Sequence, residues 1–325
     1  MSVVFAVSSA LITRDLDPNS SIISRRCVED VLMISQRTPS AGDPIDATKW
    51  TCTALCALAL CELISPTSGQ LWDLLGRAMS MLDDLCAEYH LVHRDLDDDY
   101  RRIERSLLKL ECSTAMHFRR PSPFCAMRLS VSSDKPSVST DLPDELKVMS
   151  HLFDIAERFT TLPRPSDSLM ESLIPLQMQL ASTDSHVSIQ SATLYTALHP
   201  LLTDWDMATK GMLDSHSKRL RLVIAHSAST VINHFARLDG EKRIISLWMA
   251  ADKVLEAGLV WATYLMHRRT APTEYEPSAP MGPLVAMSPI LKVSALLASF
   301  SARWESGIAH AQAWESLVEL LWNVV

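Results

Sequence analysis

Glycine is scarce in this chain, and that scarcity constrains the fold more than any other feature of the sequence. Only 8 of the 325 residues are glycine, well under half of the roughly 7% that is usual in globular proteins. Few positions can therefore adopt a positive φ at low cost, which hairpin turns and phosphate-binding loops require. The sequence predicts an all-α fold, a large domain of packed antiparallel helices with little or no sheet.

The composition indicates a folded chain with little affinity for nucleic acid. Hydrophobic residues make up 47% and charged residues 21% of the sequence, with a net charge of −8. Clustered basic residues occur only in short groups such as Arg25-Arg26 and Arg268-Arg269. Groups of two or three cations give little affinity for the phosphates of nucleic acid. The N-terminus has no basic region ahead of an apolar segment, and the apolar windows at 54–61 and 254–266 are too short to span a membrane. We expect a soluble intracellular protein with reduced thiols.

Apolar residues recur at helical spacing along several segments. The two clearest stripes are Trp72, Leu75, Met79, Leu82, Cys86 and Tyr89, and Leu220, Ile224, Ala228, Val231, Phe235 and Leu238. Further helices are expected over residues 50–64, 103–114, 241–266, 288–303 and 308–323, and less regular helical patterns cover 144–160, 167–181 and 185–203.

Details of three of these helices can also be predicted. The helix over 50–64 should be buried on most sides, with Asp46 as its N-cap. The acidic run at residues 95–99 should stabilise the positive N-terminal end of the helix that follows. The helix over 241–266 should pack antiparallel to its predecessor across an Asp239-Gly240 turn, with Ile245, Trp248, Leu255, Leu259 and Ala262 facing inward.

The chain is expected to consist of a partly disordered N-terminal arm at residues 1–45 and a helical domain at 46–325. A segment rich in serine, proline and aspartate at 130–145 predicts an exposed loop that could separate two lobes. The segment 267–289 contains five prolines and predicts a surface linker.

No motif for nucleotide binding, metalloprotease chemistry or a nucleophile elbow occurs in the sequence. Ser106 and Lys109 match the S-x-x-K spacing, but no K-T-G segment follows. Isolated histidines such as His226 and His234 have no carboxylate partner in their pattern. We therefore predict no catalytic residue, no metal ligand and no cofactor, and the residues of any small-molecule site stay unassigned.

Two groups of residues contain types that can bind metals, and each also has an ordinary structural explanation. Cys52, Cys56 and Cys61 lie in an apolar helical pattern, without the close pairs and fourth ligand typical of zinc sites, and fit small buried side chains better. His90 and His93, near Asp95, could bind a cation, but histidines at a helix C-terminus also interact favourably with the helix dipole.

The order of motifs in residues 54–121 resembles the middle homology region of fungal zinc-binuclear-cluster transcription factors. The stretches that carry the resemblance are Leu-Trp-Asp-Leu-Leu-Gly-Arg-Ala-Met at 71–79, His-Leu-Val-His-Arg at 90–94, Arg-Arg-Ile at 101–103 and Arg-Arg-Pro at 119–121. Residues 194–200, 217–266 and 296–320 resemble later helices of that family's regulatory domain, so the resemblance covers residues 50–325.

The chain departs from the family at several positions. Glu104-Arg105 stand where the family has Phe-Trp, and Glu111-Cys112 replace an Asp-Arg pair. The family's zinc cluster needs six cysteines in short basic loops, whereas only Cys27 precedes residue 50. The segment therefore cannot form the module with which the family binds DNA.

The resemblance implies a nuclear transcriptional regulator or co-regulator, of a fungal metabolic gene cluster, that acts through protein partners. Those partners would be a DNA-binding transcription factor or a homodimer or heterodimer mate, and neither specific DNA binding by this chain nor membrane association is expected. Two alternatives stay open at this point: a helical small-molecule sensor, and an enzyme of unrecognised type.

Overall fold

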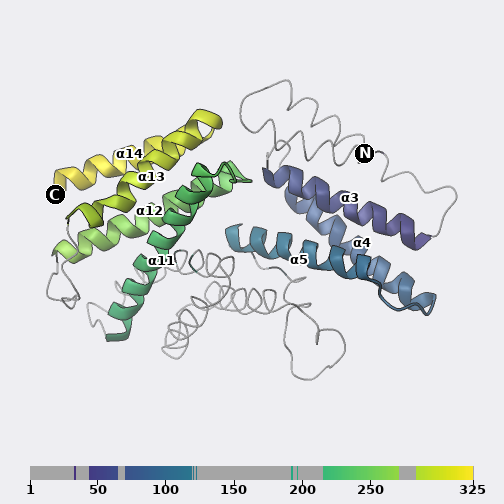
Figure 1. Ribbon diagram of the computed structural model, residues 1–325. Helices are drawn as coiled ribbons and strands as arrows, with labels where there is room; N and C mark the ends of the chain where they lie inside the picture. Colours follow the sequence, from purple (N-terminus) through teal and green to yellow (C-terminus); the bar gives the residue numbers. More distant parts are fainter. Residues whose placement is uncertain are drawn as a thin grey trace. The chain divides into compact units, whose positions relative to one another are not determined.

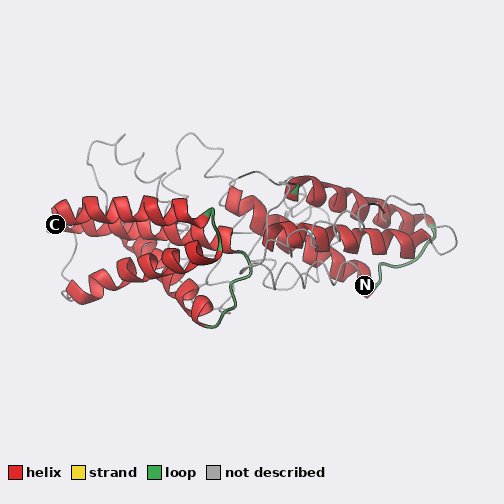
Figure 2. Ribbon diagram, turned by 90° about the horizontal axis from the view of Figure 1, so that it is seen from above, coloured by secondary structure: helices red, strands yellow, loops and turns green. Residues whose placement is uncertain are grey.

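The chain is all-α in the part that the structure describes. The computed structural model describes residues 44–64, 70–118, 215–270 and 283–324, together with residues 33, 120, 122, 192 and 196. These residues form seven long helices and no strand (Figure 2), which confirms the predicted fold class. Most of the arm expected at 1–45, the loop expected at 130–145 and the three helical patterns between 144 and 203 lie outside the described residues.

The chain divides into two compact units, Met1–Ser132 and Ser133–Val325, here called the N-terminal unit and the C-terminal unit. In the N-terminal unit, α3 (Pro44–Ile64), α4 (Leu71–Leu91) and α5 (Asp98–Phe118) pack against one another (Figure 1). The stripe predicted on α4 is confirmed, because Leu75, Leu82 and Tyr89 are buried. The buried stripe of α4 is centred slightly to one side of the predicted stripe, because the predicted residues Trp72, Met79 and Cys86 are only half-buried.

Helix α3 is buried on most sides, as its near-continuous apolar sequence predicted. Its buried residues include Cys52, Leu55, Leu58, Ala59 and Ile64. The prediction of Asp46 as the N-cap is wrong, because α3 begins at Pro44 and Asp46 lies in its first turn. Proline suits the first helical position, where the missing N–H has no partner in any case.

Among the described helices, α3 is also the one that is long and apolar enough to cross a membrane. Half of its most apolar 18-residue window is buried inside the protein. A buried core helix of a globular protein meets the same criterion of length and composition.

The C-terminal unit contains α11 (Ser215–Gly240), α12 (Leu247–Thr270), α13 (Pro283–Arg303) and α14 (Gly307–Val324). Helix α12 packs against the other three helices, and Figure 1 shows it running back from the end of α11. The stripe on α11 is confirmed for Ile224, Ala228 and Val231, which are buried, while Phe235 and Leu238 are half-buried.

The predicted inward face of α12 is wrong in two positions. Ile245 is 55% exposed because a turn at 241–246 delays the start of the helix, and Leu259 is 41% exposed. Ala262 is buried as predicted, and the rest of the buried side mixes small residues such as Ala250 and Ala257 with large ones such as Val254 and Trp261. Small side chains let neighbouring helices approach closely, and a prediction that favours large apolar residues misses them.

The proline-rich linker predicted at 267–289 is also too long. Helix α12 continues to Thr270, and α13 begins at Pro283 and includes Pro289. Pro283 occupies the favourable first position of the helix. Pro289 removes one backbone hydrogen bond within α13, and burial of the apolar residues Ile290, Val293 and Phe300 in the following turns offsets that loss.

The turn after α4 holds His93 at a φ of 52°, in the left-handed region that costs a residue with a Cβ about 1–2 kcal/mol. His93→Gly is expected to stabilise the protein by about 0.5–1 kcal/mol, because removing the strain outweighs the greater flexibility of glycine in the unfolded chain. Chemical unfolding followed by circular dichroism measures the change. The neighbouring variant Arg94→Gly, at a position without positive φ, should lose stability, and equal effects of the two substitutions would contradict the strain argument.

Candidate functional site

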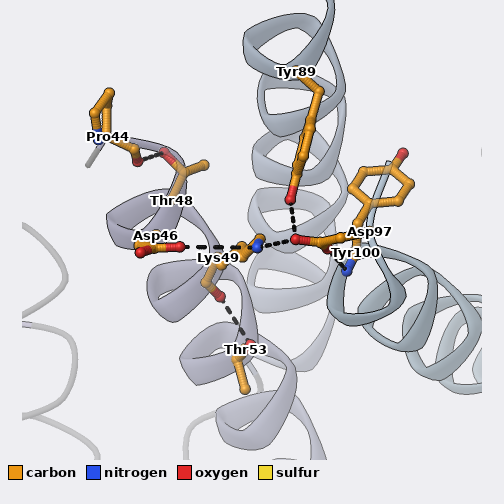
Figure 3. Close-up of polar contacts among 8 residues, drawn as sticks. All are labelled: Pro44, Asp46, Thr48, Lys49, Thr53, Tyr89, Asp97 and Tyr100. Carbon is orange, nitrogen blue, oxygen red and sulfur yellow. Dashed lines mark hydrogen bonds and ion pairs between the residues drawn. The ribbon is translucent and has the colours of Figure 1, made fainter. Parts of the chain in front are cut away.

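A polar cluster joins the three helices of the N-terminal unit at one end of the bundle (Figure 3). The Lys49 ammonium on α3 forms an ion pair with Asp97, which immediately precedes α5. Tyr89 on α4 donates a hydrogen bond to the same carboxylate at 2.5 Å, and the backbone N–H of Tyr100 donates to its other oxygen at 2.9 Å. Asp97 is thus the N-cap of α5, which confirms the capping role predicted for the acidic run.

The cluster shifts the ionisation of its members. Partial burial alone would raise the pKa of Asp97, but the hydrogen bonds from Lys49, Tyr89 and the Tyr100 amide outweigh burial and lower the pKa to about 2. Burial disfavours the charge on Lys49, yet its bonds to Asp97 and Tyr89 raise the pKa of the ammonium above its ordinary value. Burial and the bond to Asp97 raise the pKa of Tyr89. Both charges of the ion pair are therefore present at neutral pH, which suits a structural link between the helices.

The three cysteines of the apolar helix are core residues and do not converge on one point. Cys52, Cys56 and Cys61 are each at most 9% exposed, and the Cys52 thiol donates to the carbonyl oxygen of Ala78 at 3.4 Å. Its hydrogen bond with Cys56, together with burial, raises the pKa of the Cys52 thiol. In the described parts of both units, no group of three or more His, Cys, Asp or Glu side chains is placed to hold a metal ion.

The four histidines considered as candidate ligands or core residues lie on the surface or against an aromatic ring. His90, His93 and Asp95 are all exposed around the end of α4. His226 is exposed on α11, and His234 is half-buried with its ring 5.6 Å from that of Phe235.

The S-x-x-K match lies on the exposed side of α5. Ser106 and Lys109 are both exposed, and the Ser106 hydroxyl donates to the carbonyl oxygen of Arg102 at 2.9 Å. A hydroxyl that bonds to the preceding turn of its own helix is an ordinary surface feature. Neither side chain lies in a buried setting that would activate a nucleophile.

Sequence reasoning missed a histidine–carboxylate pair in the C-terminal unit. The Nε2 atom of His310 on α14 lies 2.7 Å from a carboxylate oxygen of Asp252 on α12, and the Trp304 ring packs 5.6 Å from the imidazole. The other ring nitrogen, Nδ1, is buried and has no hydrogen-bond partner in the structure. The pair links two helices and presents no ring nitrogen to a substrate. Its members lie 58 residues apart, so no local pattern could have indicated it.

A second long-range link joins α11 to α13. The Arg303 guanidinium pairs with Asp239 and packs 5.7 Å from the Phe300 ring, and the Ser299 hydroxyl donates to the same carboxylate at 3.0 Å. Both charged side chains are less than one quarter exposed. The prediction of an Asp239-Gly240 turn is wrong, because both residues lie in the last turn of α11 and the connection runs over 241–246. Asp239 ties that last turn to the neighbouring helix.

The motifs that carry the family resemblance come together in space. Arg120, from the Arg-Arg-Pro stretch, lies over the ring of Trp72 on α4, with its guanidinium carbon 5.4 Å from the ring centroid. The Phe118 ring packs 5.7 Å from the same tryptophan. At the opposite ends of these helices, the motif at 90–94 forms the turn that leads to Asp97 and α5. The motifs thus mark both ends of one α4–α5 helical hairpin.

Glu111, which departs from the family pattern, is the most deeply buried carboxyl that the structure describes. It is 2% exposed, and one of its oxygens, Oε2, has no hydrogen-bond partner. Burial raises the pKa of Glu111, although a hydrogen bond with Ser122 opposes the shift. Because the pKa of Glu111 is higher in the folded protein than its ordinary value of 4.5, the protonated carboxyl contributes to stability at pH values below 4.5. That contribution is lost as the pH rises through the folded-state pKa.

Glu111→Gln should therefore stabilise the N-terminal unit relative to the wild type at neutral pH, by about 1–3 kcal/mol, because glutamine carries no charge to bury. The advantage should shrink toward pH 4. Urea unfolding at a series of pH values measures it, with exposed Glu319→Gln on α14 as the matched control. A pH-independent difference would contradict the assignment.

Comparisons with protein-family models, with curated proteins and with solved structures found no match.

Proposed function

We propose that this protein is a nuclear transcriptional regulator or co-regulator of the fungal type, acting on a metabolic gene cluster through protein partners. The proposal rests on the resemblance of residues 50–325 to the regulatory domain of fungal zinc-cluster transcription factors. On this proposal the chain is not an enzyme, and DNA contact is left to a partner.

The observation that best supports the proposal is the α4–α5 hairpin. The resembling motifs were identified by their order along the chain, and nothing in that order requires them to touch. In the structure Trp72, from the motif at 71–79, and Arg120, from the motif at 119–121, are in contact. The turn at residues 90–94 connects the same two helices. Motifs that pack into one supersecondary unit favour a shared architecture over a chance match of short sequences.

The charge of the chain supports indirect action at a promoter. With a net charge of −8, the protein repels duplex DNA at long range, and affinity for DNA depends on the number of phosphates that cations neutralise. On this proposal a partner supplies the DNA contact.

A tethering assay tests the proposal. The whole chain is fused to a foreign DNA-binding module in a fungal reporter strain, and reporter output is compared with that of the module alone. We expect a change of several-fold, in either direction, because the proposal does not distinguish an activator from a repressor. In parallel, a gel-shift assay with the purified chain and promoter DNA should show no sequence-dependent complex.

The same pair of assays addresses the alternatives. A fusion that is expressed and folded but leaves the reporter unchanged would contradict the proposed function. Binding or turnover of a metabolite by that same protein would favour a sensor or an enzyme instead. Tight, sequence-dependent binding to duplex DNA by the chain alone would contradict the indirect mode of action.

A further inference from the structure

The outer face of α5 carries a concentration of positive charge that the acidic chain as a whole does not predict. Arg101, Arg102, Arg105 and Lys109 are all exposed. At 100° per residue they fall within about 100° of one another on the helix circumference, an arc that also contains the buried side chain of Cys112. No acidic residue occupies this face between residues 101 and 113, because Glu111 is buried and Glu104 lies toward the core and is half-buried. We call these four side chains the α5 basic face.

The arrangement is unfavourable for the isolated helix. Arg105 has like-charged neighbours one turn away on both sides, Arg101 and Lys109, and each such pair costs a helix about 0.2–0.5 kcal/mol. Within the part of the chain that the structure describes, the side chains of Arg101 and Arg105 form no hydrogen bond or ion pair. Arg102 does pair with Asp99, at 3.6 Å, but that pair is highly exposed and contributes little. An external anion would relieve the repulsion.

We propose that the α5 basic face is the docking surface for an acidic segment of a protein partner. Each guanidinium presents a planar fork of donors that matches a carboxylate in bidentate geometry. From Arg101 to Lys109 the face is about 12 Å long, or two helical turns. Two or three carboxylates at helical spacing on the partner fit that length.

The surroundings of the face favour an acidic peptide over nucleic acid. The acidic residues Asp95, Asp98 and Asp99 are exposed beside its N-terminal end. A nucleic-acid backbone continues in both directions and would pass these carboxylates, whereas a short peptide segment can end before it reaches them. The net charge of −8 adds a long-range penalty that grows with the charge of the ligand.

Fluorescence anisotropy with the full chain tests the proposal. The probe is a fluorescein-labelled helical peptide whose glutamates recur at every fourth position in an alanine and glutamine background. We expect saturable binding that weakens with added salt and disappears when glutamine replaces every glutamate. Arg105→Glu should weaken binding at least tenfold, because it removes one guanidinium and repels the peptide. The matched control is Arg237→Glu, which makes the same charge change at an exposed position on α11 and should alter binding less than twofold.

Stability provides an independent readout. Arg105→Glu replaces two like-charge pairs with two favourable ones, so the midpoint of thermal unfolding should stay the same or rise while peptide binding is lost. Three results would overturn the proposal: no binding of the acidic peptide, equal loss in the Arg105 and Arg237 variants, or stronger Arg105-dependent binding of duplex DNA than of the peptide.

The identification of the partner as a transcription protein rests on the proposed function, but the two claims fail separately. Arg105-dependent peptide binding together with a silent tethered fusion would leave the docking surface in place and refute the regulator. An active fusion whose chain does not bind the peptide would refute the docking surface alone.

Discussion

Replacing Trp314 with alanine is expected to lower the free energy of unfolding of the C-terminal unit by about 3–5 kcal/mol, the range for truncating a large buried aromatic side chain. Trp314 on α14 is 1% exposed, and its indole N–H donates to the Ser294 hydroxyl on α13 at 2.9 Å. Alanine would leave a cavity between helices and remove that hydrogen bond. Urea unfolding followed by circular dichroism measures the change. Leu320→Ala, at a 65% exposed position on the same helix, should stay within about 0.5 kcal/mol.

A double-mutant cycle tests the packing contact itself. A Cβ atom on Gly258 would lie 2.8 Å from the six-membered ring of Trp314 and 3.1 Å from Val293. Gly258→Ala should therefore cost about 1–3 kcal/mol through overpacking. Trp314→Phe frees space at this point, so the double variant should lose less stability than the sum of the two single variants. Strict additivity would contradict the packing seen between α12 and α14.

The second large effect is expected at Asp97, where Asp97→Ala should destabilise the N-terminal unit by about 2 kcal/mol. The substitution removes the cap of α5, worth about 0.5–2 kcal/mol, and leaves the Lys49 ammonium, which is 15% exposed, without its main partner. Asp97→Asn is the matched variant, because asparagine caps a helix as well as aspartate but cannot form the ion pair. It should lose clearly less stability than the alanine variant.

The pH dependence of unfolding separates the two roles of Asp97. Its pKa is lowered to about 2 from an ordinary value of 3.8, so its contribution is present above pH 4 and is lost as the pH falls through 2. Asp97→Asn should lack this part of the acid destabilisation. If the free energy of unfolding falls equally at low pH in the wild type and in Asp97→Asn, the role assigned to the Lys49–Asp97 pair is contradicted.

The sequence predicts the helices well wherever one large apolar stripe faces the core. Helices α4 and α11 have such stripes, and the scarcity of glycine excluded a fold built on hairpins. Predictions failed where size and hydrophobicity do not decide burial. On α12 the small residue Gly258 is buried where Trp314 and Val293 approach closely, whereas Leu259 is turned outward. Pro289 lies within a helix, where a local rule places a helix end.

The links between helices lie further from what sequence reasoning can reach. The acidic run at 95–99 is predicted to stabilise the start of α5, but the sequence does not single out Asp97, and its partner Lys49 is 48 residues away on another helix. Nothing in the local sequence around Lys49 indicates that contact, nor the one between Trp72 and Arg120. The α5 basic face, by contrast, is readable from the spacing of its residues once α5 is placed and its buried side is known.

The central claim is that this protein regulates transcription at promoters to which partners recruit it. The most direct test is chromatin immunoprecipitation of the tagged, untethered chain from cells that express it, combined with a gel-shift assay on the DNA recovered. The account predicts enrichment at a limited set of promoters, whose transcripts change when the protein is removed, although the purified chain does not bind those promoters. A chromatin signal no higher than that of an untagged strain, in cells where the protein is present and folded, would contradict it.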